Sequence, residues 1–458
     1  MLVPKVDKSI GIEVHATKSS GIGGVIRQSV EDFVVEEVLV DGSKAEINQA
    51  YKHKVLDSSP VRSRYLLCVL VKRDWDNLQA IKMISRQLGI SAEQIQIAGI
   101  KDAKAITAQH ITIENMTIKN VQKVNVKDIE IRPVGYIRNK LSSYYLLGNT
   151  FHITIRNIRH PKSVIKKRVA KIAEELEEMG GVPNFFGHQR FGTVRPITHL
   201  VGKALIKGNL REAAMLFLAK SSPYEHPESR QAREELKMMH DFRRALKSFP
   251  KQLHYERLML KHLAEKPDDF IGAFRRLPIK LRELFPQAYQ AYLFNKFLSK
   301  RVEDDFSLNK AETGDYAVSV ESSGLPMIMM HRLATDGTLA GINDAIKAGR
   351  MRLAIPLIGF RQHPSLGVQG EIEKQMLKEE GVSMENFKIR DMPEISARGE
   401  LRTATTLLND FSLKHISNDS ANSSKREAEL GFMLYRGSYA TVVLREIMKT
   451  RNPMKTGF

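Results

Sequence analysis

The stretch from residue 98 to residue 109 reads Ala98-Gly99-Ile100-Lys101-Asp102-Ala103-Lys104-Ala105-Ile106-Thr107-Ala108-Gln109. It places one acid, Asp102, between two basic residues, Lys101 and Lys104. Apolar runs typical of strands lie on both sides, at 95–97 and 111–113. The pattern predicts a loop of small residues between two buried strands of a mixed α/β chain. An acid among cations at such a place is positioned to stay ionised and to approach the sugar of a polyanion.

The overall composition is that of a basic globular protein. The chain has 458 residues, of which 42% are hydrophobic, so it can bury a sizeable core in roughly two or three domains. Its 71 Lys and Arg against 52 Asp and Glu give a formal net charge of +19. Such an excess attracts phosphate or an anionic surface, although some proteins are basic without any nucleic-acid partner.

Several features exclude other classes of protein. No run of about 18 apolar residues occurs, so a membrane span is not expected. The single cysteine, Cys68, lies in the apolar run 65–71, where we expect it buried and reduced, as in a cytoplasmic protein. One cysteine and 14 scattered histidines exclude a cysteine-rich zinc site. Since no dinucleotide or phosphate-loop motif is complete, we expect neither a metal nor a cofactor.

The basic charge is unevenly distributed along the chain. Residues 206–394 hold 30 basic and 26 acidic residues, whereas the rest of the chain holds 41 and 26. The character of the sequence changes over the same segment, from helical patterns to strand-like pieces punctuated by Pro and Gly. This predicts a domain at 206–394 inserted into a basic core built from 1–205 and 395–458.

Local periodicity predicts both strands and helices. The clearest helix runs from Pro161 to Met179, where apolar residues recur every three or four positions. Asp74 or Asp76 is expected to cap another helix, which Gly89 stops. Strands are expected at 33–40, 65–71, 151–158 and 428–434. In the inserted segment, helices are expected at 228–246 and 281–300, and strands at 316–320 and 351–360.

Two further stretches carry side chains that suit RNA. The run 182–192 contains Asn184, Phe186, Gln189 and Arg190, a set that can stack on bases and hydrogen-bond to their edges. An aromatic loop that fills its own core explains the same run equally well. The second stretch, 436–441, places Tyr439 at a strand-to-helix turn, where Ser438 is expected to cap the helix.

Taken together, these pieces resemble the TruD family of tRNA pseudouridine synthases, in particular its archaeal members. The resemblance rests on four motifs in the expected order. They are Glu31-Asp32-Phe33-Val34-Val35-Glu36; Gly99-x-Lys101-Asp102-x-x-Ala105-x-Thr107-x-Gln109; Asn184-Phe185-Phe186-Gly187-x-Gln189-Arg190-Phe191-Gly192; and Gly437-Ser438-Tyr439-Ala440-Thr441-x-x-x-Arg445-Glu446. The resemblance implies an α+β catalytic domain with a mixed, mainly antiparallel sheet, plus an inserted α+β domain. It also implies a V-shaped molecule with a cleft for RNA.

The resemblance further implies roles for individual residues. Asp102 would be the catalytic aspartate, and Arg27 would pair with it and keep it ionised. Phe33, Asn184 and Tyr439 would surround the target uracil, with Tyr439 standing where the family usually has Phe. Further substrate contacts are expected from Phe186, Gln189 and Arg190, and phosphate contacts from Lys101 and Lys104.

The implied reaction is the isomerisation of a uridine in tRNA, at position 13, to pseudouridine. It breaks the C1′–N1 bond and rejoins the uracil through C5, which needs neither a cofactor nor a metal. The target nucleotide has to be flipped into a pocket, where an ionised carboxylate attacks C1′ or removes the 2′ proton. A monomer is the default expectation. The alternatives are a tRNA-binding protein or chaperone without turnover, and an unrelated basic hydrolase that uses Asp102.

Overall fold

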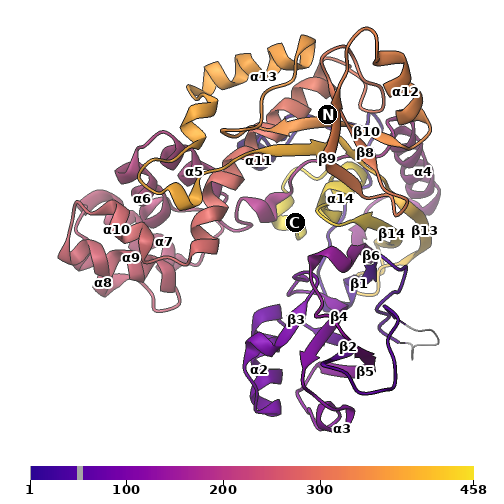
Figure 1. The fold of residues 1–458 in the computed structure, drawn as a ribbon, viewed down its shortest axis with the longest axis horizontal. Coiled ribbons are helices and arrows are strands. Elements are labelled where there is room, and N and C mark those ends of the chain that lie inside the picture. The colour runs from indigo at the N-terminus through magenta and orange to yellow at the C-terminus, as the bar shows by residue number, and fades with distance from the viewer. Residues whose placement is uncertain (1, 49–54) are drawn as a thin grey trace.

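The computed structural model describes residues 2–48 and 55–458, and an eight-stranded sheet unites both ends of the chain (Figure 1). The strand order is β13-β14-β6-β1-β4-β2-β5, with β3 paired to β4. β1 and β4 run parallel and the other pairs antiparallel, so the predicted mixed, mainly antiparallel sheet is confirmed. The strands are β1 (Phe33–Leu39), β2 (Tyr65–Arg73), β3 (Ile95–Ile97), β4 (Ile106–Glu114), β5 (Ile129–Ile137), β6 (Leu146–Ile158), β13 (Asn409–Asn418) and β14 (Arg426–Tyr435).

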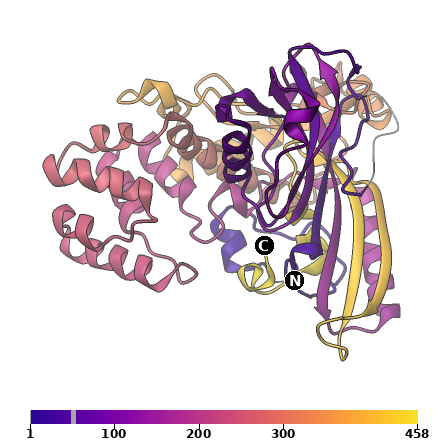
Figure 2. The same ribbon diagram turned by 90° about the horizontal axis from the view of Figure 1, so that it is seen from below.

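Amphipathic helices cover this sheet. The apolar stripe of α4 (Lys162–Glu178) is buried as predicted, and Figure 2 shows this helix lying along the long β13–β14 hairpin. The Asp76 side chain caps α2 (Asn77–Leu88), and Gly89 ends that helix in the left-handed conformation. Cys68 is buried under α2, as expected. The remaining helices here are α1 (Lys5–Ser9), α3 (Ile118–Val121) and α14 (Ala440–Met448).

A run of helices follows over residues 198–303, and α6 to α10 of this run gather at one end of the molecule (Figure 1). The helices are α5 (Thr198–Ile206), which precedes the predicted boundary at 206, and then α6 (Leu210–Ala219), α7 (Pro227–Met239), α8 (Phe242–Ser248), α9 (His254–Glu265), α10 (Phe270–Arg275) and α11 (Ile279–Glu303). The segment 228–246, predicted as helical, is helical but divided into α7 and α8. His240 takes the left-handed conformation and ends α7, and the Asp241 side chain then caps α8.

A four-stranded antiparallel sheet follows, in the order β11-β10-β8-β9. Its strands are β8 (Tyr316–Val320), β9 (Pro326–Leu333), β10 (Met351–Leu357) and β11 (Glu400–Thr403), and its helices are α12 (Leu339–Lys347) and α13 (Gly367–Glu380). Because β11 pairs with β10, the second sheet extends beyond the predicted boundary at 394. The chain rejoins the first sheet only at β13, after β12 (Thr405–Thr406) has paired with β7 (Val182–Pro183).

Short 3₁₀ turns complete the described chain. They lie at Val30–Asp32, Ala92–Gln94, Ser143–Tyr145, His188–Arg190, Met384–Phe387, Pro393–Ile395 and Pro453–Thr456.

The central helix α11 joins the inserted segment to the 182–192 run. Its Asn295 side chain accepts from the Phe186 amide at 2.8 Å and donates to the carbonyl oxygens of Ile10, at 2.9 Å, and Phe186, at 3.1 Å.

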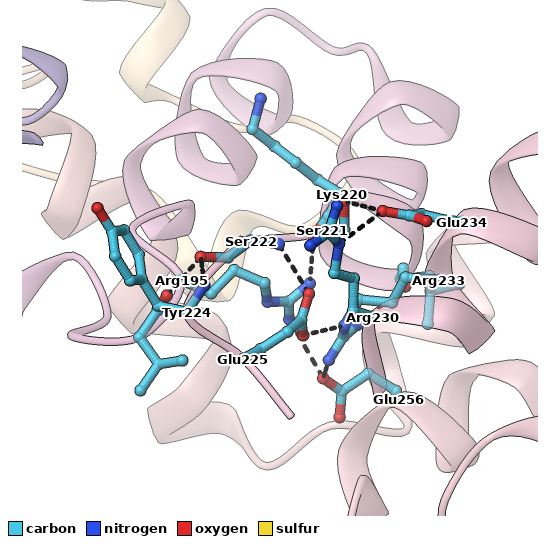
Figure 3. Close-up of polar contacts among 12 residues, drawn as sticks. Arg195, Lys220, Ser221, Ser222, Tyr224, Glu225, Arg230, Arg233, Glu234 and Glu256 are labelled. Atoms are coloured by element: carbon cyan, nitrogen blue, oxygen red, sulfur yellow. Dashed lines mark hydrogen bonds and ion pairs between the residues drawn. The ribbon is translucent and has the colours of Figure 1, made fainter. Parts of the chain in front are cut away.

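Two arginines tie the start of the inserted helices together (Figure 3). Arg233, which is 2% exposed, pairs with Glu225 at 3.0 Å and Glu256 at 2.6 Å. Arg195 also reaches Glu256, at 3.2 Å, and donates to the carbonyl oxygens of Phe217 and Lys220 at the end of α6. Arg195 follows the 182–192 run, so this cluster fixes the helices to the segment that carries Asn184 and Phe186.

Removing one carboxylate from this cluster should destabilise the protein. We expect Glu256→Gln to lower the free energy of unfolding by about 3 kcal/mol, because two buried guanidinium groups lose their shared counter-charge. Urea denaturation measures the change. Glu234→Gln, in the exposed Arg230–Glu234 pair drawn in the same figure, is the matched control and should change stability little. Equal effects of the two substitutions would contradict this account.

Candidate active site

Asp102 lies in the loop between β3 and β4, where the sequence predicts it. Its Oδ1 accepts a hydrogen bond from Arg27 NH2 at 2.9 Å, across a separation of 75 positions. The Asp102 side chain is 37% exposed and the Arg27 side chain 13%. The pair therefore combines a carboxylate open to solvent with a guanidinium held inside the protein.

Two contacts and a constrained backbone conformation hold Arg27 in place. Its guanidinium lies 4.0 Å from the centroid of the Phe33 ring, a cation–π contact. Its NH1 donates to the Gly457 carbonyl oxygen at 3.1 Å. Its backbone is in the left-handed region, with φ 57°, a conformation that costs energy in a non-glycine residue and is retained where the surroundings enforce it. Arg27 is thus positioned before any substrate arrives.

Lys72 of β2 holds the backbone of the same loop through hydrogen bonds. Its ammonium group, buried at the end of β2, donates to the carbonyl oxygens of Asp102 and Trp75, both at 2.7 Å. Burial lowers the pKa of Lys72 to about 8, an effect that the nearby Asp102 carboxylate opposes. Sequence reasoning missed this residue, although a lysine closing the apolar run 65–71 was a signal that it has a buried partner.

The prediction that Lys101 contacts phosphate is wrong. Lys101 points inward and pairs with the buried Glu37 of β1 at 2.6 Å, with only 2% of its side chain exposed. The same Glu37 accepts from the His110 amide at 3.0 Å. Lys101 neutralises a buried carboxylate, whose pKa it helps to lower against the effect of burial, so it is not available to RNA. Lys104, in contrast, is exposed.

A second group of residues surrounds the Phe186 ring. Phe186 makes edge-to-face contacts with Phe294, at 5.6 Å between centroids, and with Tyr439, at 6.2 Å. On it lies the guanidinium of Arg402, 4.0 Å from the ring centroid. Three of the residues expected from the sequence, Asn184, Phe186 and Tyr439, therefore meet here.

Arg402 is the organising residue of this group, and the sequence did not point to it. It donates to the carbonyl oxygen of Asn184 at 2.9 Å, to Asn184 Oδ1 at 2.6 Å and to the Gly437 carbonyl oxygen at 2.9 Å. Asn184 Nδ2 in turn donates to the carbonyl oxygen and the hydroxyl of Thr403. Arg402 thus joins the Asn184 motif to the Gly437 motif.

The neighbouring residues of both motifs are also engaged. Gln189 Oε1 accepts from the Thr441 hydroxyl at 3.3 Å, and Arg190 donates to Gln287 Oε1 at 3.2 Å. Tyr439, rather than the predicted Ser438, occupies the cap position of α14. The Ser438 hydroxyl is turned away and donates to the Thr406 hydroxyl at 2.8 Å.

The two groups are neighbours in space. Gly457, which binds Arg27, precedes Phe458, whose ring lies 6.3 Å from the imidazole of His188 in the Asn184 motif. Arg436, next to Gly437, donates to the Leu146 carbonyl oxygen, and Leu146 packs against Ala98 at the start of the Asp102 loop. Asp102 and Phe186 are thus linked through two short chains of contacts, one by Gly457 and Phe458 and one by Arg436 and Leu146.

Two further findings concern other kinds of site. Within residues 2–48 and 55–458, no group of three or more His, Cys, Asp or Glu side chains is placed to hold a metal ion. Among the helices of these described ranges, none is long and apolar enough to cross a membrane.

A mixed sheet built from both ends of the chain, with an arginine-held carboxylate in the β3–β4 loop, fits the architecture of a pseudouridine synthase. Comparison with known proteins agrees. The model of the family tRNA pseudouridine synthase D (TruD) matches residues 9–447. The chain belongs to the TruD family, as the four motifs led us to expect.

Relatives match over nearly their whole length. A probable tRNA pseudouridine synthase D of Methanosarcina mazei is 39% identical over 99% of this chain and 100% of its own. One from Pyrococcus abyssi is 35% identical over 95% of this chain and 98% of its own. A crystal structure of the M. mazei candidate TruD superposes with a TM-score of 0.85, at 39% identity, and covers 99% of this chain and 100% of that one.

Proposed function

We propose that this protein isomerises a uridine of tRNA to pseudouridine, with Asp102 as the catalytic carboxylate and position 13 as the target. The observation that carries this proposal is the Arg27–Asp102 pair, in which a buried guanidinium holds a solvent-open carboxylate at 2.9 Å. Family membership and the basic charge of the chain support tRNA as the substrate.

In this reaction the C1′–N1 bond breaks, the uracil turns, and C5 bonds to C1′. The proton on C5 is lost and N1 gains one, so no other atom is added or removed. Asp102 either attacks C1′ or takes the 2′ proton, and both routes need an ionised carboxylate beside the sugar. Arg27 orients that carboxylate, which is the geometric contribution that makes such an attack fast.

The aromatic group would hold the detached base. Base stacking on an aromatic ring contributes about 1–3 kcal/mol, enough to keep a free uracil in place while it turns. Both Nδ2 protons of Asn184 have partners in Thr403, whereas Asn184 Oδ1 accepts one hydrogen bond from Arg402 and has capacity for a second. We therefore assign to Asn184 the role of accepting the N3–H of the uracil.

Other parts of the proposal concern the rest of the molecule. RNA would lie in a cleft between the first sheet and an inserted domain that begins near residue 206, with exposed Lys104 on a phosphate. The monomeric state and the cytoplasmic location stay predictions. Release of tritium from tRNA labelled at C5 of uridine tests the activity, because a protein that only binds tRNA releases none.

The contact between Arg27 and Gly457 gives a separate test of this site. Gly457 has φ +92°, and an added Cβ would lie 2.2 Å from the Ile26 carbonyl oxygen, so Gly457→Ala has to displace the carbonyl that holds Arg27. We expect tritium release under single-turnover conditions to slow by about tenfold or more. Gly208→Ala is the matched control, because Gly208 also has positive φ (+76°) but open space around it. Equal rates for the two variants would show that the Gly457 carbonyl does not position Arg27.

A further inference from the structure

A cavity of about 510 Å³ lies beside Phe186, on the side of the second sheet. Its walls come from β9, β10, β11, the start of α11 and the turn after β14. Asp102, Arg27 and Phe33 do not line it, so it is distinct from the carboxylate–arginine pair. Five arginines line the cavity, namely Arg190, Arg352, Arg398, Arg402 and Arg436. We call this space the arginine cavity.

Three of these arginines are largely buried without a carboxylate partner. Among the described residues, no carboxylate lies within ion-pair distance of Arg190, Arg352 or Arg402. Burial lowers the pKa of all three guanidinium groups, that of Arg402 to about 10. Cations taken out of water without a counter-charge are unfavourable, and a bound anion relieves that cost.

The acids on the cavity wall do not fill this role. Glu283 pairs with Lys280, and Glu394 pairs with Arg282. Glu400 is exposed and makes no ion pair in the part of the chain that the structure describes, although its charge acts on Arg190 and Arg402. The wall therefore keeps a net positive charge after the internal pairs have been taken into account.

Donors for an anion are also present. Arg402 Nε and NH2 donate hydrogen bonds to Asn184 and Gly437, whereas within the described ranges its NH1 makes no hydrogen bond. The Arg352 guanidinium lies 5.5 Å from the centroid of the Tyr435 ring. Guanidinium groups present planar sets of donors that match the oxygens of a phosphate.

We infer that the arginine cavity binds the nucleotide next to the target uridine and holds its backbone phosphate with Arg352 and Arg402. This inference rests on the proposed function. The cavity falls within the roughly 300–1,000 Å³ that sites for small organic ligands have, so it has room for a nucleotide and not only for an ion. Ile328, Leu357 and Tyr435 offer the base an apolar wall, and Asn184 and Phe186 make the boundary with the uracil site.

Salt dependence of tRNA binding tests the phosphate contact. We expect Arg352→Met to weaken binding and to reduce the slope of log K against log[salt] by about one, as for the loss of one phosphate contact. Arg350→Met is the matched control, since Arg350 lies two positions earlier, is exposed and does not line the cavity. Arg352→Lys should recover most of the slope. An unchanged slope in correctly folded Arg352→Met would overturn the inference.

Neutral backbone substitutions test which phosphate is held. In synthetic RNA substrates, each phosphate near the target uridine is replaced in turn by an uncharged methylphosphonate. We expect the wild-type protein to lose affinity at a phosphate next to the target, and Arg352→Met to show no further loss there. Additive losses at every position would overturn the inference. If wild-type protein releases tritium normally while these effects are missing, only the cavity assignment fails; if it releases none, the proposed function fails.

Discussion

Replacing Asp102 with Asn is expected to lower the rate of pseudouridine formation by at least about 10³-fold, the scale seen when an essential catalytic group is removed. An amide can neither attack C1′ nor remove the 2′ proton, so both routes are blocked. Binding of tRNA should stay close to that of the wild type. Asn keeps the size of Asp and an oxygen that can accept from Arg27, and Arg27 itself stays anchored on Phe33 and Gly457.

Two measurements check this result. Tritium release from C5-labelled tRNA reports turnover, and carbodiimide labelling followed by primer extension reports which uridine was modified. Asp268→Asn, an exposed aspartate on the inserted segment, is the matched control and should react at the wild-type rate. Normal labelling at the target uridine by Asp102→Asn protein would remove Asp102 from the mechanism.

Much of the fold near Asp102 could be predicted from local patterns. The loop lies between apolar runs that form β3 and β4, and the helix capped by Asp76 follows from a side chain that satisfies backbone amides within three residues. These signals act over short distances along the chain. The break within the helical segment 228–246 could not be predicted in the same way, because apolar spacing carries no information on the left-handed turn at His240.

The site was less predictable because its contacts are distant in sequence. The Arg27–Asp102 pair came from resemblance to a family, and no local pattern joins positions 75 residues apart. Arg402 lies on a short strand, β11, whose pairing with β10 places it over Phe186. Gly457 acts through a main-chain carbonyl, which any residue has, so its side chain gave no sign of the role.

For Lys101, the local sequence pattern led to a wrong prediction of the direction in which the side chain points. Two basic residues around an acid suggest a surface that faces phosphate. In the structure, Asp102 faces Arg27 while its neighbour Lys101 turns the other way, toward Glu37 in the core. Leaving the buried Glu37 carboxylate without a counter-charge would be far more unfavourable than losing one exposed contact to phosphate. The Lys101 ammonium group therefore pairs with Glu37.

Replacing Arg402 with Met should damage catalysis and stability together. Asn184 would lose the donors to its carbonyl and side-chain oxygens, and Gly437 the donor to its carbonyl. Leaving such acceptors without donors should lower the free energy of unfolding by about 2–3 kcal/mol. Displacement of Asn184 and of the Phe186 ring should lower kcat by about 10²-fold, the cost of a misplacement near 1 Å in an active site.

A comparison of kcat with KM separates this positioning role from simple charge loss. Arg402→Lys keeps the charge but cannot span three acceptors with one ammonium group, so it should restore tRNA affinity far better than it restores kcat. Arg352→Met, which removes a guanidinium from the same cavity without touching Asn184, should raise KM and leave kcat close to the wild-type value. Urea denaturation and tritium release under saturating tRNA measure the two effects. If Arg402→Met protein that is folded at the assay temperature keeps its kcat, then Asn184 does not depend on Arg402 for its place, and the link between the two motifs is structural only.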